Sequence, residues 1–259
     1  MGEALKNRPI CVIGNDEFGP AIAERIAACR LRTLYTALPG SPSPIYGDML
    51  EPLRTPSNLA LDCPIVLAAI EDTETFRMLF VDGAKSGSGV PLQPGSVLVD
   101  LGARTPDELQ ALLGLLEARG IALVDAALIG GPEAAAEGRA KILLGGNEAA
   151  VVVAETVLSL LGHVERTGPL GSAHAAAALM GYIEAAHAVA REEAIALGAA
   201  CGLTAETLTR VLSDETLPHG LNVVQLARRA ALARRIARDK GGSADIIDLA
   251  AARSRRENR

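Results

Sequence analysis

The residues with the clearest chemical meaning are two glycines that follow a short apolar run. Ile10–Ile13 is predicted to be a strand, and it leads directly into Gly14-Asn-Asp-Glu-Phe-Gly19, after which a helical pattern begins. In a unit of this kind the first glycine makes the turn, and the last lets the helix pack closely on the strand. The amides at such a helix start bind a dinucleotide pyrophosphate. The spacing predicts a dinucleotide site, with a plain strand–turn–helix as the alternative.

The same turn departs from the dinucleotide pattern at its middle position, where Asp16 stands in place of a glycine. A carboxylate there adds bulk and negative charge beside a diphosphate, and like charges repel. An NAD site carries an acid about 20 residues further on, but no acid lies between Arg25 and Gly47. We expect NADP or NAD as the cofactor. Its predicted contacts are Gly14, Asn15, Phe18, Gly19 and Thr36.

Three later segments complete a pattern in this order: Asp125-Ala-Ala-Leu-Ile-Gly-Gly131, Gly138-Arg-Ala-Lys-Ile-Leu-Leu-Gly-Gly146 and Gly168-Pro-Leu-Gly-Ser-Ala-His-Ala-Ala-Ala177. With the glycine turn, they resemble the β-hydroxyacid dehydrogenase superfamily, which includes 3-hydroxyisobutyrate dehydrogenase, 6-phosphogluconate dehydrogenase and imine reductases. The resemblance covers roughly residues 9–215. It implies a nicotinamide cofactor, a cleft between two domains, a small-molecule substrate and a helical dimerisation domain.

The chain also departs from this family at residues that carry its chemistry. The family's substrate loop has a serine where this chain has Ile129, although Gly130 and Gly131 remain as expected backbone donors to the substrate. The family's catalytic lysine falls on Ala177 and its asparagine on Gly181. Neither side chain moves a proton, so oxidation of a hydroxyacid by a lysine base is not expected.

Two polar residues of the same segment match the 6-phosphogluconate dehydrogenase version of the motif. They are His174 and Glu184, which the resemblance makes the expected catalytic residues and proton donors, with Tyr182 as a further donor. The alternative is that His174 packs near the helix start and Glu184 is a solvated or ion-paired surface residue. Lys141 lies where the family has a threonine, and a surface strand lysine is the preferred interpretation.

The elements that must position these residues follow from the apolar pattern. Residues 1–168 alternate short apolar runs with helical patterns, which predicts an α/β fold of the Rossmann type, with a doubly wound, mostly parallel sheet. Residues 169–259 contain an alanine-rich run from Ser172 to Ala200 and further helical patterns at 205–212, 222–240 and 243–252. The chain is therefore predicted to hold a nucleotide-binding domain, 1–168, and a long helix leading into a small all-helical domain, 169–259.

Composition narrows the class of protein. The 259 residues are 49% hydrophobic, 22% charged and only 2% aromatic, with a net charge of −6. These values predict a globular chain and no nucleic-acid partner. The four cysteines form no C-x-x-C pair, so we expect reduced, buried thiols and no metal site. We expect no signal peptide, no membrane span and a cytoplasmic location. Apolar helix faces in a small C-terminal domain predict a homodimer.

Two functions remain open. The first is an NAD(P)H-dependent oxidoreductase that reduces C=O or C=N, because a reductase needs a proton donor but not a lysine. The second is a non-catalytic protein on the same scaffold that binds a ligand or nucleotide. The residues at positions 16, 129, 177 and 181 favour the second.

Overall fold

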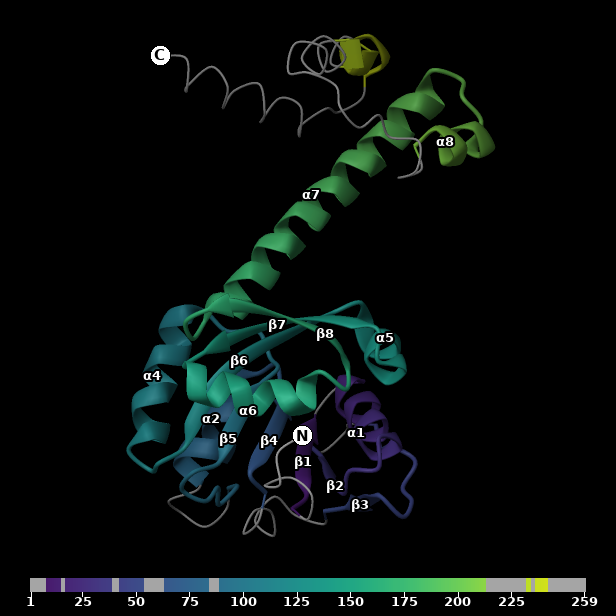
Figure 1. The fold of residues 1–259 in the computed structure, drawn as a ribbon. Helices are drawn as coiled ribbons and strands as arrows, with labels where there is room; N and C mark the ends of the chain where they lie inside the picture. Colours follow the sequence, from purple (N-terminus) through teal and green to yellow (C-terminus); the bar gives the residue numbers. More distant parts are fainter. Residues whose placement is uncertain are drawn as a thin grey trace. The chain divides into compact units, whose positions relative to one another are not determined.

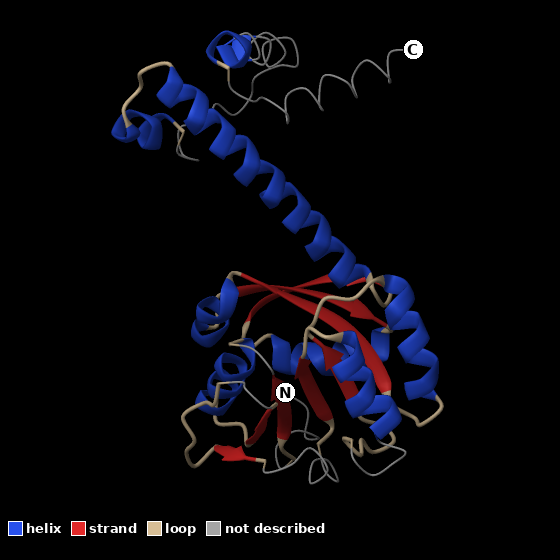
Figure 2. Cartoon of the chain, turned by 180° about the vertical axis from the view of Figure 1, so that it is seen from behind, coloured by secondary structure: helices blue, strands red, loops and turns tan. Residues whose placement is uncertain are grey.

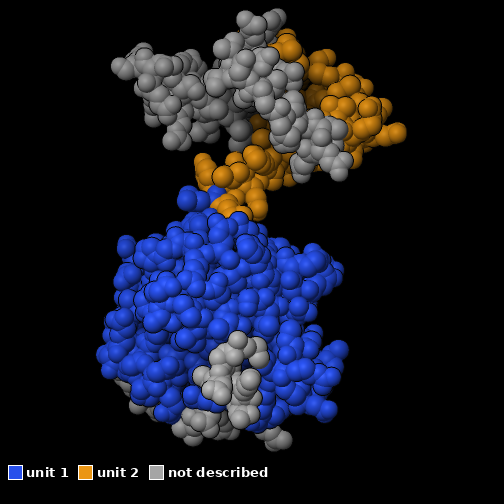
Figure 3. Space-filling view, viewed as in Figure 1, with its two compact units in different colours: residues 1–179 blue, residues 180–259 orange. Residues whose placement is uncertain are grey.

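The computed structural model describes residues 8–14, 17–38, 42–53, 63–83, 89–212, 232–233 and 236–241. The chain divides into two compact units, residues 1–179 and residues 180–259 (Figure 3). The sequence predicts a boundary after residue 168, ahead of the long helix, whereas the units divide inside that helix. Its first turns belong to the first unit because Ala173 and His174 are buried there.

The first unit is built on one sheet of eight strands in the order β3-β2-β1-β4-β5-β6-β7-β8. All neighbouring strands are parallel except β6 and β7, which are antiparallel. The first six positions have the strand order of a Rossmann fold, which places a ligand crevice where the chain direction reverses, between β1 and β4. The strands are β1 (Ile10–Gly14), β2 (Thr33–Ala37), β3 (Leu50–Pro52), β4 (Ile65–Ala69), β5 (Val97–Asp100), β6 (Ala122–Ile129), β7 (Ala140–Gly146) and β8 (Gly162–Gly168).

Helices cover both faces of this sheet (Figure 1 and Figure 2). Side chains of α1, α5 and α6 form one buried cluster with the strands, and side chains of α2, η3 and α4 form a second. Alternate residues of β1 belong to the two clusters, so the strand is apolar throughout. The helices are α1 (Phe18–Ala28), α2 (Thr73–Arg77), η3 (Met78–Asp82, a π-helical turn), α4 (Pro106–Glu117), α5 (Gly131–Glu137), α6 (Glu148–Leu158), α7 (Ser172–Ala200) and α8 (Ala205–Val211).

The predicted fold class is confirmed, and the differences are local. β3, α5 and β8 are not predicted from the sequence. β3 has three residues and ends in a proline, and β8 is a partly exposed strand with the polar sequence GHVERTG. The helix predicted over 222–240 is described only at 232–233 and 236–240, which are helical, and the one predicted over 243–252 lies outside the described residues.

The structure also describes the four cysteines, whose thiols are predicted to be buried, and the helices, none of which is predicted to span a membrane. Cys11 and Cys63 are buried, Cys29 is partly buried and Cys201 is exposed, so the expectation of buried thiols fails at Cys201. Burial raises the pKa of the Cys11 thiol. Within the described ranges, no helix is both long enough and apolar enough to cross a bilayer, and no cluster of three potential metal ligands occurs.

Candidate active site at the carboxyl edge of the sheet

The glycine turn after β1 is packed tightly against α1. A Cβ on Gly14 would lie 2.7 Å from the Cα of Gly19, and a Cβ on Gly19 would lie 3.0 Å from the Oη of Tyr35. Tyr35 is fully buried in β2, and its hydroxyl donates a hydrogen bond to the carbonyl of Pro42 at 3.2 Å. Both glycine positions therefore exclude a side chain. Tight packing of this kind is what the first and last glycines of a dinucleotide-binding turn provide, so Gly14 and Gly19 fit a dinucleotide.

The other predicted cofactor contacts have different outcomes. Phe18 opens α1 and lines a cavity at the carboxyl edge of the sheet. Thr36 pairs with Ile13 across β1 and β2, and its side chain is buried, so its role stays a prediction. Asn15 and Asp16 lie outside the described residues.

The cavity has a volume of about 140 Å³ and lies where strands β4, β5 and β6 end. Position 177, which holds the lysine in the family that the chain resembles, is one of its walls and is an alanine here. Glu71 is the one charged side chain among the described residues that line it. Its walls include Phe18, Glu71, Leu101, Gly102, Ile129 and Ala177.

Gly130 and Gly131, the predicted substrate-binding residues, follow Ile129 at the end of β6. Both have left-handed backbone conformations, with φ of 111° and 81°. Glycine adopts this conformation without strain. The backbone thus requires glycine at this turn for conformational reasons, in addition to any contact with a substrate.

His174 is 4% exposed, and both of its ring nitrogens contact the backbone. Nδ1 accepts a hydrogen bond from the Arg104 amide at 3.3 Å, and Nε2 lies 3.2 Å from the carbonyl oxygen of Asp100 and 3.3 Å from that of Ala126. Because carbonyl oxygens only accept, the ring proton is on Nε2. The imidazole joins β5, β6 and α7. This geometry supports the structural alternative for His174 and not the predicted role of proton donor.

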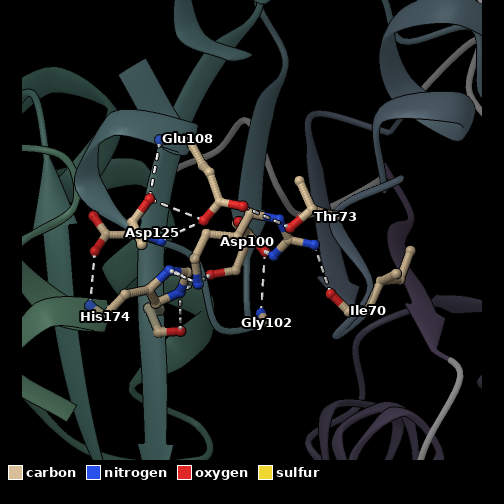
Figure 4. Close-up of polar contacts among 10 residues, drawn as sticks. Ile70, Thr73, Asp100, Gly102, Glu108, Asp125 and His174 are labelled. Carbon is tan, nitrogen blue, oxygen red and sulfur yellow. Dashed lines mark hydrogen bonds and ion pairs between the residues drawn. The ribbon is translucent and has the colours of Figure 1, made fainter. Parts of the chain in front are cut away.

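Asp100 and Arg104 form a fully buried ion pair beside this histidine (Figure 4). The guanidinium contacts the Asp100 carboxylate at 2.5 Å, donates to the Ile70 carbonyl at 2.7 Å and lies over the Phe76 ring at 4.3 Å from its centroid. Burial raises the pKa of Asp100 above its ordinary value, against the opposing effect of Arg104. Arg104 thus ties the end of β4 to the end of β5.

The same guanidinium leaves no room for a side chain at position 102. A Cβ on Gly102 would lie 3.2 Å from the Cζ of Arg104 and closer still to its Nη1. The Gly102 amide donates to the Asp100 carboxylate at 3.0 Å. The space that a side chain would need is therefore occupied by the ion pair.

Asp125 caps the start of α7. Its buried carboxylate accepts hydrogen bonds from the amides of Gly171, Ala173 and His174 at 2.8, 2.9 and 3.0 Å. Figure 4 shows the bond from His174. A carboxylate at this place satisfies amides that have no partner within the helix and interacts favourably with the helix dipole. Asp125 therefore fixes the segment that brings Ala177 to the cavity.

Glu184 lies in the second unit, on the exposed surface of α7. With His187 and Arg191 it lines a hollow of about 510 Å³ whose other walls are alanines and Leu212. These three side chains share one helix face because they are spaced by three and four residues. Tyr182 is 72% exposed on the same helix. Lys141 pairs with Glu165 at 2.7 Å on the surface of the sheet, which supports the surface interpretation of that lysine.

Glu71, Arg104 and Asp125 are not among the residues predicted from the sequence. Asp125 opens the motif that ends at Gly131, so its type and its place before a glycine pair are visible in the sequence. Asp100, the ion-pair partner of Arg104, is four residues away, but Ile70 and Phe76 lie about 30 residues earlier in the chain. Nothing in the sequence distinguishes Glu71 from the neighbouring acids Asp72 and Glu74.

A Rossmann sheet with tightly packed glycines at positions 14 and 19 after β1 and a cavity at the adjoining strand ends is typical of a nicotinamide dinucleotide-binding protein. Residues 9–171 match the family model described as the NAD binding domain of 6-phosphogluconate dehydrogenase. The chain belongs to this family, within the β-hydroxyacid dehydrogenase superfamily that its motifs resemble.

Individual relatives agree with this assignment. The chain is 31% identical over 168 residues to an L-threonate dehydrogenase of Cupriavidus necator, a match that covers 62% of this chain and 54% of that protein. The chain spans about half the length of the curated relatives it matches.

Among solved structures, a reductive aminase from Aspergillus terreus in complex with NADPH and ethyl levulinate superimposes with a TM-score of 0.75. The sequences are 18% identical, with 97% of this chain and 95% of that chain covered. An imine reductase variant from Myxococcus stipitatus in complex with NAD⁺ also gives a TM-score of 0.75, with 15% identity and coverage of 95% and 92%. These structures share the fold.

Proposed function

We propose that the protein is an NAD(P)H-dependent oxidoreductase that reduces C=O or C=N bonds, and not a lysine-dependent hydroxyacid dehydrogenase. The observation that carries the proposal is the wall of the cavity at the strand ends. Position 177 faces this cavity as an alanine, and no lysine lines it among the described residues. Removing a proton from a hydroxyacid requires a base at the reacting oxygen, whereas reduction requires only delivery of a hydride and a proton.

Each group of residues has its own role in the proposed reaction. The bound dihydronicotinamide supplies the hydride. Gly14 and Gly19 keep side chains away from the pyrophosphate, and Phe18 forms part of the cavity wall. The amides of Gly130 and Gly131 orient the substrate. Glu184 remains as the proton donor that the resemblance implies, and this role is part of the proposal.

The first experiment is binding of NADPH and of NADH, followed by the fluorescence of the cofactor, since the chain has no tryptophan. It continues with cofactor oxidation in the presence of ketones, cyclic imines, and ketone–amine mixtures. We expect binding and oxidation with at least one carbonyl or imine, and no reduction of NADP⁺ or NAD⁺ by hydroxyacids. Hydroxyacid oxidation at a rate matching or exceeding the reductions would refute the proposal.

The role of Glu184 has a separate test. Glu184→Gln is expected to lower kcat for a ketone, which needs a proton at its oxygen, about 100-fold, which is the scale of general acid catalysis, with cofactor affinity unchanged. Glu192→Gln, an exposed acid eight residues along the same helix, is the matched control and is expected to keep full activity. Equal activity of the two variants would remove Glu184 from the mechanism.

A non-catalytic ligand-binding protein is the second candidate. It is favoured by the alanine at position 177 and by the glycine at position 181, where a Cβ would meet no atom within 4 Å, so packing alone does not require glycine. This candidate predicts cofactor or nucleotide binding without turnover of any substrate in the panel.

We also propose a homodimer and a cytoplasmic location. Dimer formation is supported by exposed apolar side chains on α7, such as Leu179 and Ile183, at 66% and 53% exposure. Light scattering of the full chain tests it, and a monomer at micromolar concentration would overturn it. The location rests on the sequence expectation alone.

A further inference from the structure

We propose that Glu71 recognises a cationic nitrogen of the substrate, so that the preferred substrate class is a protonated imine. The inference rests on the proposed reductase function and names its substrate class. It starts from the cavity at the strand ends, whose other described walls are apolar side chains and a glycine. A single carboxylate in such surroundings favours a cation and disfavours an anionic substrate such as a hydroxyacid.

The backbone on both sides of Glu71 is fixed. Arg104 donates to the carbonyl of Ile70, the preceding residue, at 2.7 Å. Asp72, the following residue, caps α2 by accepting from the amide of Thr75 at 2.7 Å and from its hydroxyl at 2.6 Å. Asp72 is therefore the acid that caps α2. The side chain of the neighbouring Glu71 is exposed and lines the cavity.

The guanidinium of Arg104, which contacts the Ile70 carbonyl beside Glu71, does not line the cavity. Arg104 is fully buried and paired with Asp100, at 2.5 Å between Nη1 and Oδ1. Glu71 is therefore the one charged side chain among the described residues of the cavity wall.

Reduction of a protonated imine is also compatible with the absence of a lysine at position 177. A protonated imine already carries its proton on nitrogen, so transfer of a hydride to the imine carbon gives a neutral amine and NADP⁺. The two electrons come from NADPH, the C=N π-bond becomes a nitrogen lone pair, and no proton donor is needed at position 177. A ketone, by contrast, needs a proton at oxygen as the hydride arrives. Ala177 in the cavity wall is therefore compatible with reduction of a protonated imine.

The test uses the full chain and two matched variants, Glu71→Gln and Glu74→Gln. Glu74 is an exposed acid three residues further on, in the first turn of α2, and it does not line the cavity. The probe is 2-methylpyrrolidine, a cation at neutral pH, compared with the neutral 2-methyltetrahydrofuran. Binding is measured by calorimetry with and without NADPH, so the readout does not depend on turnover. Turnover of 2-methyl-1-pyrroline and of cyclopentanone is measured in parallel.

We expect Glu71→Gln to weaken binding of the cation about five- to tenfold, as for a partly exposed charge pair. We expect Glu71→Gln to keep its affinities for NADPH and for 2-methyltetrahydrofuran within about twofold of the unmodified protein. The control Glu74→Gln should match the unmodified protein within about twofold in every one of these measurements. kcat/KM should fall for the pyrroline and not for cyclopentanone. Thermal melting of the variants confirms that they are folded, and Glu71→Lys serves as a second variant that should abolish binding of the cation.

Three results would overturn the inference. These are unchanged binding of the cation by Glu71→Gln, an equal effect of Glu74→Gln, or an equal loss of NADPH affinity, which would assign Glu71 to the cofactor. Failure of the proposed function looks different: no substrate is turned over, while binding of the cation still depends on Glu71.

Discussion

Replacing Asp125 by asparagine removes the charge from the cap of α7 and leaves its shape unchanged. The carboxylate is fully buried, with one oxygen on the Gly171 amide and the other on the amides of Ala173 and His174. An asparagine keeps one acceptor oxygen. Its NH₂ group must then face either the Gly171 amide or the other two, so that donor meets donor inside the protein.

The expected loss of stability follows from these contacts. One hydrogen bond to a charged acceptor disappears, at roughly 1.5–3 kcal/mol, and the other two weaken by roughly 1 kcal/mol each when the acceptor becomes neutral. The total for Asp125→Asn is about 3.5–5 kcal/mol. In urea, with a slope of about 1–3 kcal/mol per M, the midpoint of unfolding should fall by at least about 1 M.

The assay is urea unfolding of the full chain followed by far-ultraviolet circular dichroism. Asp107→Asn is the matched control, because Asp107 is an exposed acid in the first turn of α4 and its replacement should change stability by less than about 0.5 kcal/mol. Gly145→Ala perturbs the same cap from the other side, since a Cβ there would lie 2.5 Å from the Asp125 carboxylate and 2.6 Å from the Ser172 hydroxyl. We expect a loss of about 1–3 kcal/mol.

An Asp125→Asn variant within about 1 kcal/mol of the unmodified protein would refute the reasoning, because a buried cap of this kind cannot then be a main attachment of α7. If that variant does not fold, Gly145→Ala still gives a graded measurement. A stable Gly145→Ala variant would contradict the tight packing around the carboxylate.

Three further predictions concern other contacts. Gly14→Ala places a Cβ against backbone, and we expect at least a tenfold loss of NADPH affinity, measured by cofactor fluorescence; unchanged affinity would argue against the turn as the pyrophosphate site. Thr105→Ala removes the capping box of α4 and should destabilise the protein by about 1 kcal/mol at neutral pH. The backbone amide and then the hydroxyl of Thr105 lower the pKa of Glu108, so their stabilisation is present above the ordinary pKa of a glutamate and is lost as the pH falls through the lowered value. The variant keeps the amide and loses the hydroxyl, so the stability difference between the two proteins should narrow in acid unfolding without closing. Arg104→Met leaves Asp100 buried without its partner and should cost about 3–5 kcal/mol in urea unfolding, and Asp100→Leu in the same chain should recover most of it; a neutral single variant would contradict this account.

Much of the fold was predictable because its signals are local. The strand that ends at Gly14 is an uninterrupted apolar run, and the helix start at Thr105 carries a capping box that involves residues only three positions apart. β8 gives no such signal. Its polar sequence pairs with β7 through backbone hydrogen bonds, which any residues except proline can make, so only the neighbouring strand reveals it.

The site was predictable in its backbone and less so in its side chains. The glycine positions follow from the need to exclude a Cβ, and the sequence alone shows that position 177 is an alanine. His174 fits two roles equally well in a sequence pattern, and only its contacts with the carbonyls of Asp100 and Ala126 separate them. Arg104 also contacts the Ile70 carbonyl and the Phe76 ring, which lie about 30 residues earlier, and no sequence pattern indicates contacts at this separation.

The two outer strands of the sheet bear on how the molecule avoids aggregation. An unpaired strand edge is a template on which another chain can add a strand. β3 has only three residues and ends in Pro52, which has no amide hydrogen to donate. β8 carries Glu165 and Arg166 in ion pairs with Lys141 and Glu148 at 2.7 Å, so an incoming strand would have to disrupt charged contacts. Association of copies by sheet extension is therefore disfavoured at both edges, and specific self-association has to use other surfaces.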